Sequence, residues 1–103
     1  MSVINVTKEN FEAEVLKSDV PVLADFNAGW CGPCRAMKPM LDELAEGNTA
    51  YKIVSIDIDE EDELADEYDV TSIPCLVVFK GGEEVNRSVG LIAKDAIAEL
   101  VEG

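Results

Sequence analysis

The chain has 103 residues, of which 48% are hydrophobic and 29% charged, and this is the size and composition of one globular domain with a single core. Eight basic residues against twenty-two acidic ones give a net charge of −14, so the surface should repel nucleic-acid phosphates and anionic lipid headgroups. We therefore expect one domain over residues 1–103 that binds neither nucleic acid nor membranes.

The cysteine and histidine counts narrow the chemistry and the compartment. Three cysteines are an odd number, which does not suit a disulfide framework and fits a reducing cytoplasm better. Residues 1–15 lack a basic region followed by an apolar stretch, and no apolar run approaches the ~18 residues of a membrane span. The absence of histidine excludes Ser-His and Cys-His catalytic pairs. We expect a cytoplasmic protein that uses thiols, carboxylates, lysine or tyrosine.

The first part of the chain shows one helical and one extended pattern. Residues 3–6 fit a short strand, and Thr7 is placed to cap a helix over residues 8–18. Residues 20–26 form a mostly apolar run with β-branched side chains, which is typical of a strand buried on both faces of a sheet.

The later part of the chain, beyond a second helix described below, continues the alternation of strands and helices. It predicts a strand over 51–58, an acidic helix over 61–70, two hairpin strands over 75–80 and 83–89 joined by Gly81-Gly82, and a final helix over 93–103. This order predicts an α/β fold with a mixed central sheet, one antiparallel edge and helices on both faces.

Cys31 and Cys34 stand where the predicted strand gives way to a helix that runs to about Gly47 and should kink at Pro39. Thiols at positions i and i+3 lie on one side of a helical turn, so they can bridge or share a metal. Unpaired N–H groups and the helix dipole should stabilise a thiolate on Cys31, whereas Cys34, one turn deeper, should be more shielded. This asymmetry suits thiol–disulfide exchange, with Cys31 attacking and Cys34 resolving the mixed disulfide.

The residues between the cysteines fit the same chemistry. Pro33 suits the first helical turn, where a missing N–H costs nothing, and Gly32 leaves room for another polypeptide near the sulfur. Two other interpretations stay open. A zinc site would need Cys75 and a carboxylate, because there is no second CxxC and no histidine, or both cysteines are inert core residues. We expect neither a metal nor a cofactor.

The segments "ADFNAGWCGPCRAMKPML" and "SIPCLVVFKGGEEV", followed by "VG" at residues 89–90, resemble the pattern of the thioredoxin family in order and spacing. The resemblance covers essentially the whole chain. It implies a thioredoxin fold, a cis peptide bond before Pro74 opposite the cysteines, and protein-disulfide reductase activity. It also implies two kinds of partner, namely disulfide-containing client proteins and a thioredoxin-reductase-type electron donor.

Asp25 interrupts the apolar strand, and an isolated ionised carboxylate there is costly, so its pKa should be raised. It is either a strand-end residue that reaches solvent or caps a helix, or, as the resemblance implies, a buried acid/base that moves the proton of Cys34. The sequence departs from the family nearby. Ser55 matches a position where a lysine commonly accompanies this aspartate, and Asn27 stands where the family usually has tryptophan.

The resemblance also implies an apolar surface for close approach of the client around Cys31. Its members are expected to be Trp30, Gly32, Pro33, Ile73, Pro74 and Gly90. Taken one by one, most of these residues would be read as core or turn positions.

Cys75, directly after Pro74, allows two interpretations. It is a small buried hydrophobe at the start of a strand, inert because apolar surroundings raise its pKa, or it lies near Cys34 and forms an alternative disulfide or a metal site. We expect the inert residue.

These observations favour a small monomeric dithiol reductant that cleaves disulfides in client proteins. The alternative is a binding module of the same fold whose redox activity is incidental. Within the redox class, Pro33 between the cysteines favours a reducing pair over an oxidase or isomerase.

Overall fold

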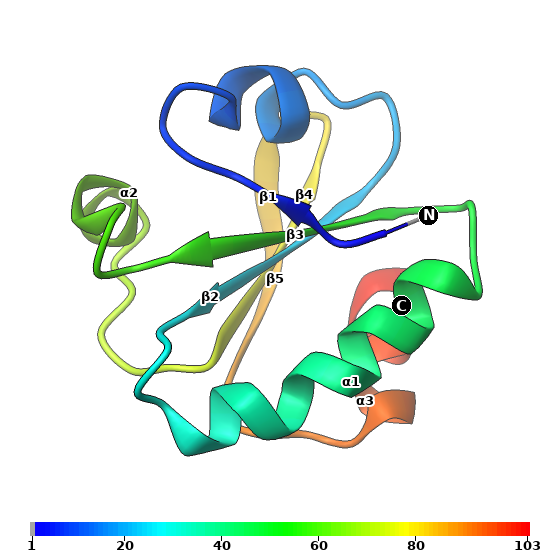
Figure 1. Cartoon of the computed structure of the whole chain (residues 1–103). Helices are drawn as coiled ribbons and strands as arrows, with labels where there is room; N and C mark the ends of the chain where they lie inside the picture. Colours follow the sequence, from blue (N-terminus) through cyan, green and yellow to red (C-terminus); the bar gives the residue numbers. More distant parts are fainter. Residues whose placement is uncertain (1) are drawn as a thin grey trace.

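The computed structural model describes residues 2–103 (Figure 1). In chain order the elements are β1 (Ile4–Asn5), the short π-helical segment η1 (Glu12–Leu16), β2 (Val22–Asn27), α1 (Gly32–Glu46), β3 (Lys52–Asp57), α2 (Asp62–Glu67), β4 (Cys75–Lys80), β5 (Glu83–Val89) and α3 (Lys94–Glu102).

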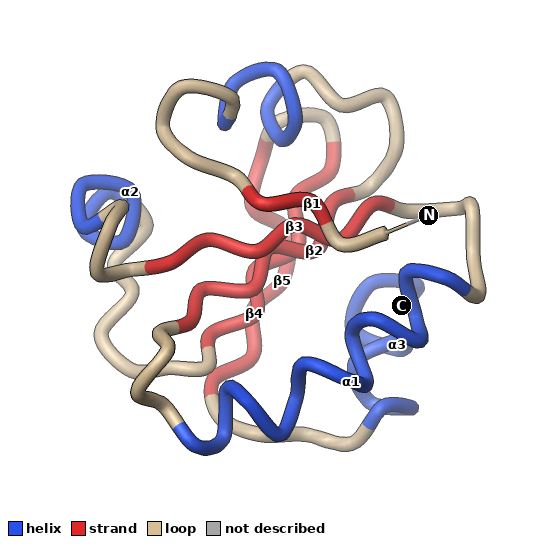
Figure 2. Tube along the Cα trace, in the orientation of Figure 1, coloured by secondary structure: helices blue, strands red, loops and turns tan. Residues whose placement is uncertain are grey.

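The five strands form one mixed sheet in the order β1-β3-β2-β4-β5, which Figure 2 shows as a continuous layer between the helices. β1, β3 and β2 are parallel, whereas β4 runs antiparallel to β2 and β5 antiparallel to β4. The predicted mixed sheet with an antiparallel hairpin edge is confirmed. β2 lies at the centre, so its carboxyl end, from which the cysteine loop departs, is flanked by strands on both sides.

Each face of the sheet has its own core, because side chains alternate along the central strands. Val22, Ala24 and Phe26 of β2 pack with residues of η1 and α2. Leu23 packs on the other face, against α1 and α3, which lie together on one side of the sheet in Figure 1. Asp25 belongs to the face of Leu23, and it therefore points into the layer between the sheet and α1.

The first helix is much shorter than predicted. Residues 8–18 were expected to be helical with Thr7 as the cap, but only Glu12–Leu16 is helical, with a bond from the Lys17 N–H to the Glu12 carbonyl at 2.8 Å. The side chain of Asn10 explains the late start, since its Oδ1 accepts from the Thr7 N–H at 2.7 Å and its Nδ2 donates to the Asn5 carbonyl at 3.2 Å. These bonds hold residues 7–10 as a turn.

Other element boundaries differ for local reasons. The acidic helix predicted over residues 61–70 ends at Glu67, because Asp69 adopts a left-handed φ of 54°. Gly81 and Gly82 have φ values of 61° and 82°, as a primed hairpin turn requires, so that turn is confirmed. Pro39 lies inside α1, and the kink expected there stays a prediction. No helix within residues 2–103 is long and apolar enough to cross a membrane.

Candidate active site

Cys31 and Cys34 form a disulfide at the beginning of α1, with their Cα atoms 5.2 Å apart, within the usual range for a disulfide. Cys31 is the N-cap, in extended conformation, and its sulfur accepts a hydrogen bond from the Cys34 N–H at 3.2 Å. Pro33 occupies the first turn, where its missing N–H leaves no helical bond unmade. The free Cys34 N–H of this turn therefore points toward the Cys31 sulfur, where it and the helix dipole favour negative charge.

The two cysteines are equally buried, which corrects one expectation. Cys34 was predicted to be more shielded than Cys31, but each is 5% exposed in the disulfide form. The residues differ instead in the hollow that each one lines. Cys31 lines a groove on the outside of the molecule, and Cys34 lines a cavity beneath the start of α1. The two residues therefore differ in their surroundings and not in their exposure.

The outer groove, of about 420 Å³, brings together most of the residues expected to face a client. Trp30, Gly32 and Pro33 line it on either side of Cys31 in the chain, and Ile73 comes from the loop before β4. Trp30 is 67% exposed, yet its indole is held in place because Nε1 donates to Oδ2 of Asp59 at 2.9 Å. A large, exposed and oriented aromatic ring beside the disulfide is suited to contact another polypeptide. Sequence analysis missed Asp59, which holds the indole, and three residues that line the groove, Ile58, Thr71 and Ser72.

Pro74 and Gly90, the other two residues of the expected surface, lie next to this groove without lining it. The Ile73–Pro74 peptide bond is cis, as the family resemblance implied. The Gly90 N–H donates to the Pro74 carbonyl at 2.8 Å, and Gly90 has a φ of 99°, which favours glycine. Ile73 itself packs against Cys31 and Cys34. The two residues therefore fix the loop that presents Ile73 to the disulfide.

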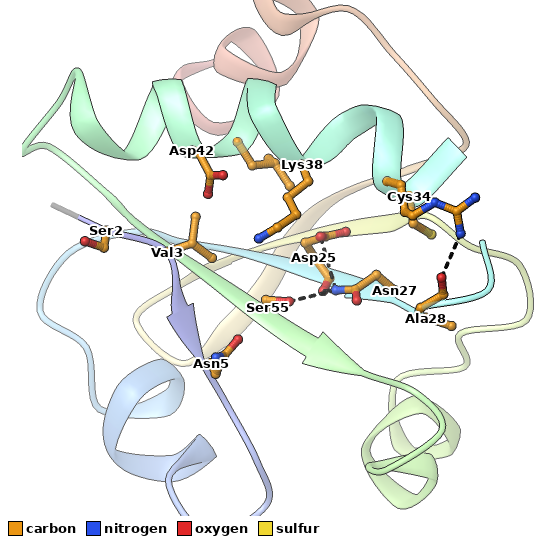
Figure 3. Close-up of a pocket in the computed structure, with 13 residues that line it drawn as sticks. Ser2, Val3, Asn5, Asp25, Asn27, Ala28, Cys34, Lys38, Asp42 and Ser55 are labelled. Carbon is orange, nitrogen blue, oxygen red and sulfur yellow. Dashed lines mark hydrogen bonds between the residues drawn. The ribbon is translucent and has the colours of Figure 1, made fainter. Parts of the chain in front are cut away.

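The cavity beneath α1, of about 340 Å³, contains Asp25 beside Cys34 (Figure 3). Asp25 is 6% exposed, and it is the only buried charged residue in the described part of the chain. Burial raises the pKa of its carboxyl to about 7, while the Asn27 hydrogen bond and the Lys38 charge act in the lowering direction. The expected buried carboxyl is confirmed, and the alternatives of a solvent-reaching or helix-capping residue are wrong.

Asn27 holds one side of the Asp25 carboxylate. Its Nδ2 lies 3.2 Å from Oδ2 of Asp25, 2.8 Å from the Asp25 carbonyl and 2.8 Å from Oγ of Ser55, as the dashed lines to side chains in Figure 3 show. Ser55 stands directly opposite Asp25 in β3. The sequence signal for this contact was the two-residue spacing of Asp25 and Asn27, which puts both side chains on one face of a strand.

Oδ1 of Asp25 has no hydrogen-bond partner among residues 2–103, although it is buried. An unpaired buried oxygen is costly, and such atoms in a native protein call for an explanation in terms of a proton, a ligand or function. Cys34 lines the same cavity. A carboxyl that titrates near neutral pH and the second cysteine of the pair therefore line the same cavity.

Cys75 lies on the opposite face of the sheet from Asp25. It is 1% exposed and packs with Phe26, Val77 and Phe79, and burial raises the pKa of its thiol. It is a free cysteine, so the alternative of a Cys34–Cys75 bridge is wrong for this structure, and the buried residue that we expected is found. Within residues 2–103 no three cysteine or carboxylate side chains gather as metal ligands would.

The structure combines a mixed sheet, a cysteine pair at the start of a helix and a buried carboxyl that shares a cavity with the second cysteine. This combination is that of a dithiol–disulfide exchange protein. The family model described as Thioredoxin matches residues 2–103. Thioredoxin of Bacillus subtilis (strain 168) is 49% identical over 102 residues, covering 98% of this chain and 96% of the relative. Thioredoxin 1 of Nostoc sp. is 45% identical over 98 residues, covering 94% and 92%. The solved structure of a mutant thioredoxin from Halobacterium salinarum NRC-1 matches with a TM-score of 0.90 at 39% identity, covering 98% of this chain and 88% of that chain.

The chain belongs to the thioredoxin family and has the thioredoxin fold. Members of this family are protein-disulfide oxidoreductases, and with its Cys31–Cys34 pair this chain is a protein-disulfide reductase that acts by dithiol–disulfide exchange. Thioredoxins in general reduce disulfide substrates and are themselves reduced by thioredoxin reductase.

Proposed function

We propose that Cys31 is the attacking thiol of this reductase and that Cys34 resolves the intermediate. The Cys31 thiolate attacks a client disulfide, forms a Cys31–client disulfide and releases the first client sulfur as a thiolate. The Cys34 sulfur, once it has lost its proton, attacks Cys31, forms the Cys31–Cys34 disulfide and releases the second client thiolate. Two electrons pass from the cysteine pair to the client. The hydrogen bond from the Cys34 N–H to the Cys31 sulfur supports this order of attack.

Asp25 is the base that takes the proton from Cys34. The observation that carries this assignment is that both residues line one cavity, while Oδ1 of Asp25 is buried without a partner in residues 2–103. A pKa of about 7 suits a group that accepts and returns a proton at neutral pH. The cavity also has exposed residues at its rim, Ser2 and Asn5, so the proton has a route back to solvent.

The client polypeptide lies along the outer groove, between the Trp30 indole and the loop that carries Ile73. The groove is mostly apolar, and a chain has room to approach Cys31 because Gly32 has no side chain and open space lies beside it. Pro33 completes this surface, and Pro74 and Gly90 hold the Ile73 loop beside it. Binding here orients the client disulfide toward Cys31.

The protein works as a monomer of one domain over residues 1–103 in the cytoplasm, and a thioredoxin-reductase-type enzyme returns the electrons. A reducing compartment is supported by the odd number of cysteines, which leaves Cys75 as a free thiol. The chain has no histidine, and the raised pKa of Asp25, about 7, supports its role as the base.

Reduction of insulin by dithiothreitol, followed as turbidity, tests this function with wild type, Cys34→Ser and Cys75→Thr. We expect Cys34→Ser to lose catalysis and to accumulate a mixed disulfide on Cys31, because nothing resolves it, whereas Cys75→Thr should remain active. Full activity of Cys34→Ser would refute the assigned roles. The binding-module alternative gains support if a double Cys31→Ser, Cys34→Ser variant captures the same partners with undiminished affinity.

A further inference from the structure

Two cations line the cavity that contains Asp25, and both come from α1. Arg35 is already engaged, because its Nη1 donates to the Gly29 carbonyl at 2.8 Å. Lys38 makes no hydrogen bond and no ion pair with any of residues 2–103. It follows Cys34 by four residues, so the two side chains lie on the same face of the helix. In Figure 3 its amino group is turned toward Asp25 and β3.

The other walls of the cavity bring no charge to Asp25. β2 contributes Asn27, β3 contributes Ser55, and β1 contributes Asn5, all of them uncharged. Asp42 of α1 also lines the cavity, and it is an acidic residue like Asp25. Lys38 is therefore the single unengaged positive charge that faces the carboxyl in the described cavity. Its lowering effect on the pKa of Asp25 comes after burial and the Asn27 bond in size.

We propose that Lys38 is a positioning residue for proton transfer at Asp25, holding the carboxylate in its ionised form while Asn27 fixes its orientation and leaves Oδ1 open toward Cys34. This inference rests on the proposed role of Asp25 as the base for Cys34. Ser55, directly across the sheet, has no charge with which to do this, so the charge comes from the helix that also carries the reacting thiol.

The step that Lys38 assists is the resolution of the mixed disulfide. The Cys34 Sγ–H bond breaks and its proton moves to Oδ1 of Asp25. The Cys34 sulfur then forms a bond with Cys31 while the Cys31–client bond breaks, and the client leaves as a thiolate that carries the electron pair. The proton on Asp25 returns to solvent through the cavity, whose volume of about 340 Å³ and polar lining leave room for several water molecules.

The interaction acts across the cavity rather than in a direct ion pair, and Lys38 is an exposed residue. Opposite charges in contact change a carboxyl pKa by about 1 to 3 pH units, so a separated and partly screened charge should change it by less. We expect Lys38→Met to raise the pKa of Asp25 by roughly half a pH unit, since one opposing positive charge is lost.

The test compares Lys38→Met with Lys38→Arg, which keeps the charge, and with Lys80→Met, which removes the same charge at the opposite end of the sheet. The Asp25 carboxyl is titrated by 13C NMR in each reduced protein, and the rate of resolution of a Cys31 mixed disulfide is measured from pH 5 to 9. Lys38→Met should raise the Asp25 pKa and slow resolution about twofold at pH 7, with no difference at pH 9, because a rise of half a unit halves the ionised fraction near the pKa. Lys38→Arg and Lys80→Met should titrate like wild type.

An unchanged Asp25 titration in Lys38→Met overturns the inference, as does an equal change in Lys80→Met. Asp25→Asn separates this failure from failure of the proposed function. If Asp25→Asn removes the pH dependence of resolution near neutrality while Lys38→Met leaves it unmoved, Asp25 remains the base and only the role of Lys38 is wrong. If Asp25→Asn leaves the pH dependence intact, the base is another group, and the inference about Lys38 is wrong with it.

Discussion

The backbone N–H of Cys34 donates a hydrogen bond of 3.2 Å to the sulfur of Cys31. This contact exists because Cys31 occupies the N-cap position of α1, where the first N–H groups of the helix have no carbonyl partner. A sulfur in the capping position accepts these bonds best when it is a thiolate, since hydrogen bonds to charged groups are stronger. We therefore expect the backbone at the start of α1 to stabilise a Cys31 thiolate.

Alkylation of the reduced protein tests the difference between the thiols. With sub-stoichiometric iodoacetamide at neutral pH, peptide mapping should find Cys31 labelled first, because its thiolate is stabilised by the helix start and it faces the open groove. Cys34 should react more slowly and Cys75 only after unfolding. Preferential labelling of Cys34 would reverse the roles of the two residues.

Asp25→Asn should stabilise the protein above neutral pH. The wild-type carboxyl has a pKa raised from 3.8 to about 7, so the folded protein holds a proton that the unfolded chain has released over this interval. The contribution of this group to the free energy of unfolding is thus complete below about pH 4. It is lost as the pH rises through about 7, and this lowers the free energy of unfolding by up to about 4 kcal/mol. Asparagine has the same shape as aspartate but does not ionise. The free energy of unfolding of Asp25→Asn should therefore exceed that of wild type by an amount that grows from pH 4 to pH 8 and then levels off.

Urea denaturation of both oxidised proteins at pH 4.5, 6, 7 and 8.5 measures this advantage as a difference in unfolding free energy. Asp42→Asn, on the rim of the same cavity and only half-buried, is the matched control and should show a smaller change with pH. A pH-independent difference between wild type and Asp25→Asn would mean that Asp25 does not titrate in the folded protein near neutrality.

Cys75→Thr should leave disulfide reduction unchanged and cost about 1 kcal/mol of unfolding free energy, because a hydroxyl replaces a thiol in an apolar core. Mapping of the air-oxidised wild type should find Cys31–Cys34 as its intramolecular bridge. Loss of reductase activity in Cys75→Thr without a loss of stability would show that this thiol takes part in the reaction, against its position on the far face of the sheet.

Trp30→Ala should impair reduction of a protein disulfide more than reduction of a small one. The exposed indole should contact a client polypeptide and contribute to its binding, whereas a small aromatic disulfide can reach Cys31 without contacting the indole. The measurement is kcat/KM for insulin against that for dithiobis(nitrobenzoate), and we expect a loss of about tenfold, or about 1.4 kcal/mol, for insulin alone.

Asp59→Asn is the companion variant, because it weakens the acceptor that orients the indole while leaving the ring present. It should produce a smaller loss than Trp30→Ala for insulin. Equal losses for both substrates in Trp30→Ala would place the effect on the chemistry of the cysteines and not on the client groove.

The order of the elements, the mixed sheet and the cysteine pair at a helix start could be predicted from the sequence, because each rests on local periodicity, spacing or a recognisable motif. Local patterns failed where side chains competed with the backbone. Asn10 turned the expected first helix into a turn, and the left-handed Asp69 shortened the acidic helix. The buried carboxyl at Asp25 was also foreseeable, since one acidic residue interrupted an apolar strand.

Apart from Asn27, which the strand spacing already places beside Asp25, the surroundings of that carboxyl were decided by tertiary structure. Ser55 contacts Asn27 next to Asp25 because β2 and β3 pair in one particular register, and Lys38 faces Asp25 because α1 packs over that face of the sheet. The same packing separates Cys75 from Cys34, since alternate residues of a strand point to opposite faces. Such relationships join positions far apart in the chain, and they depend on strand register and helix placement, which no local pattern specifies.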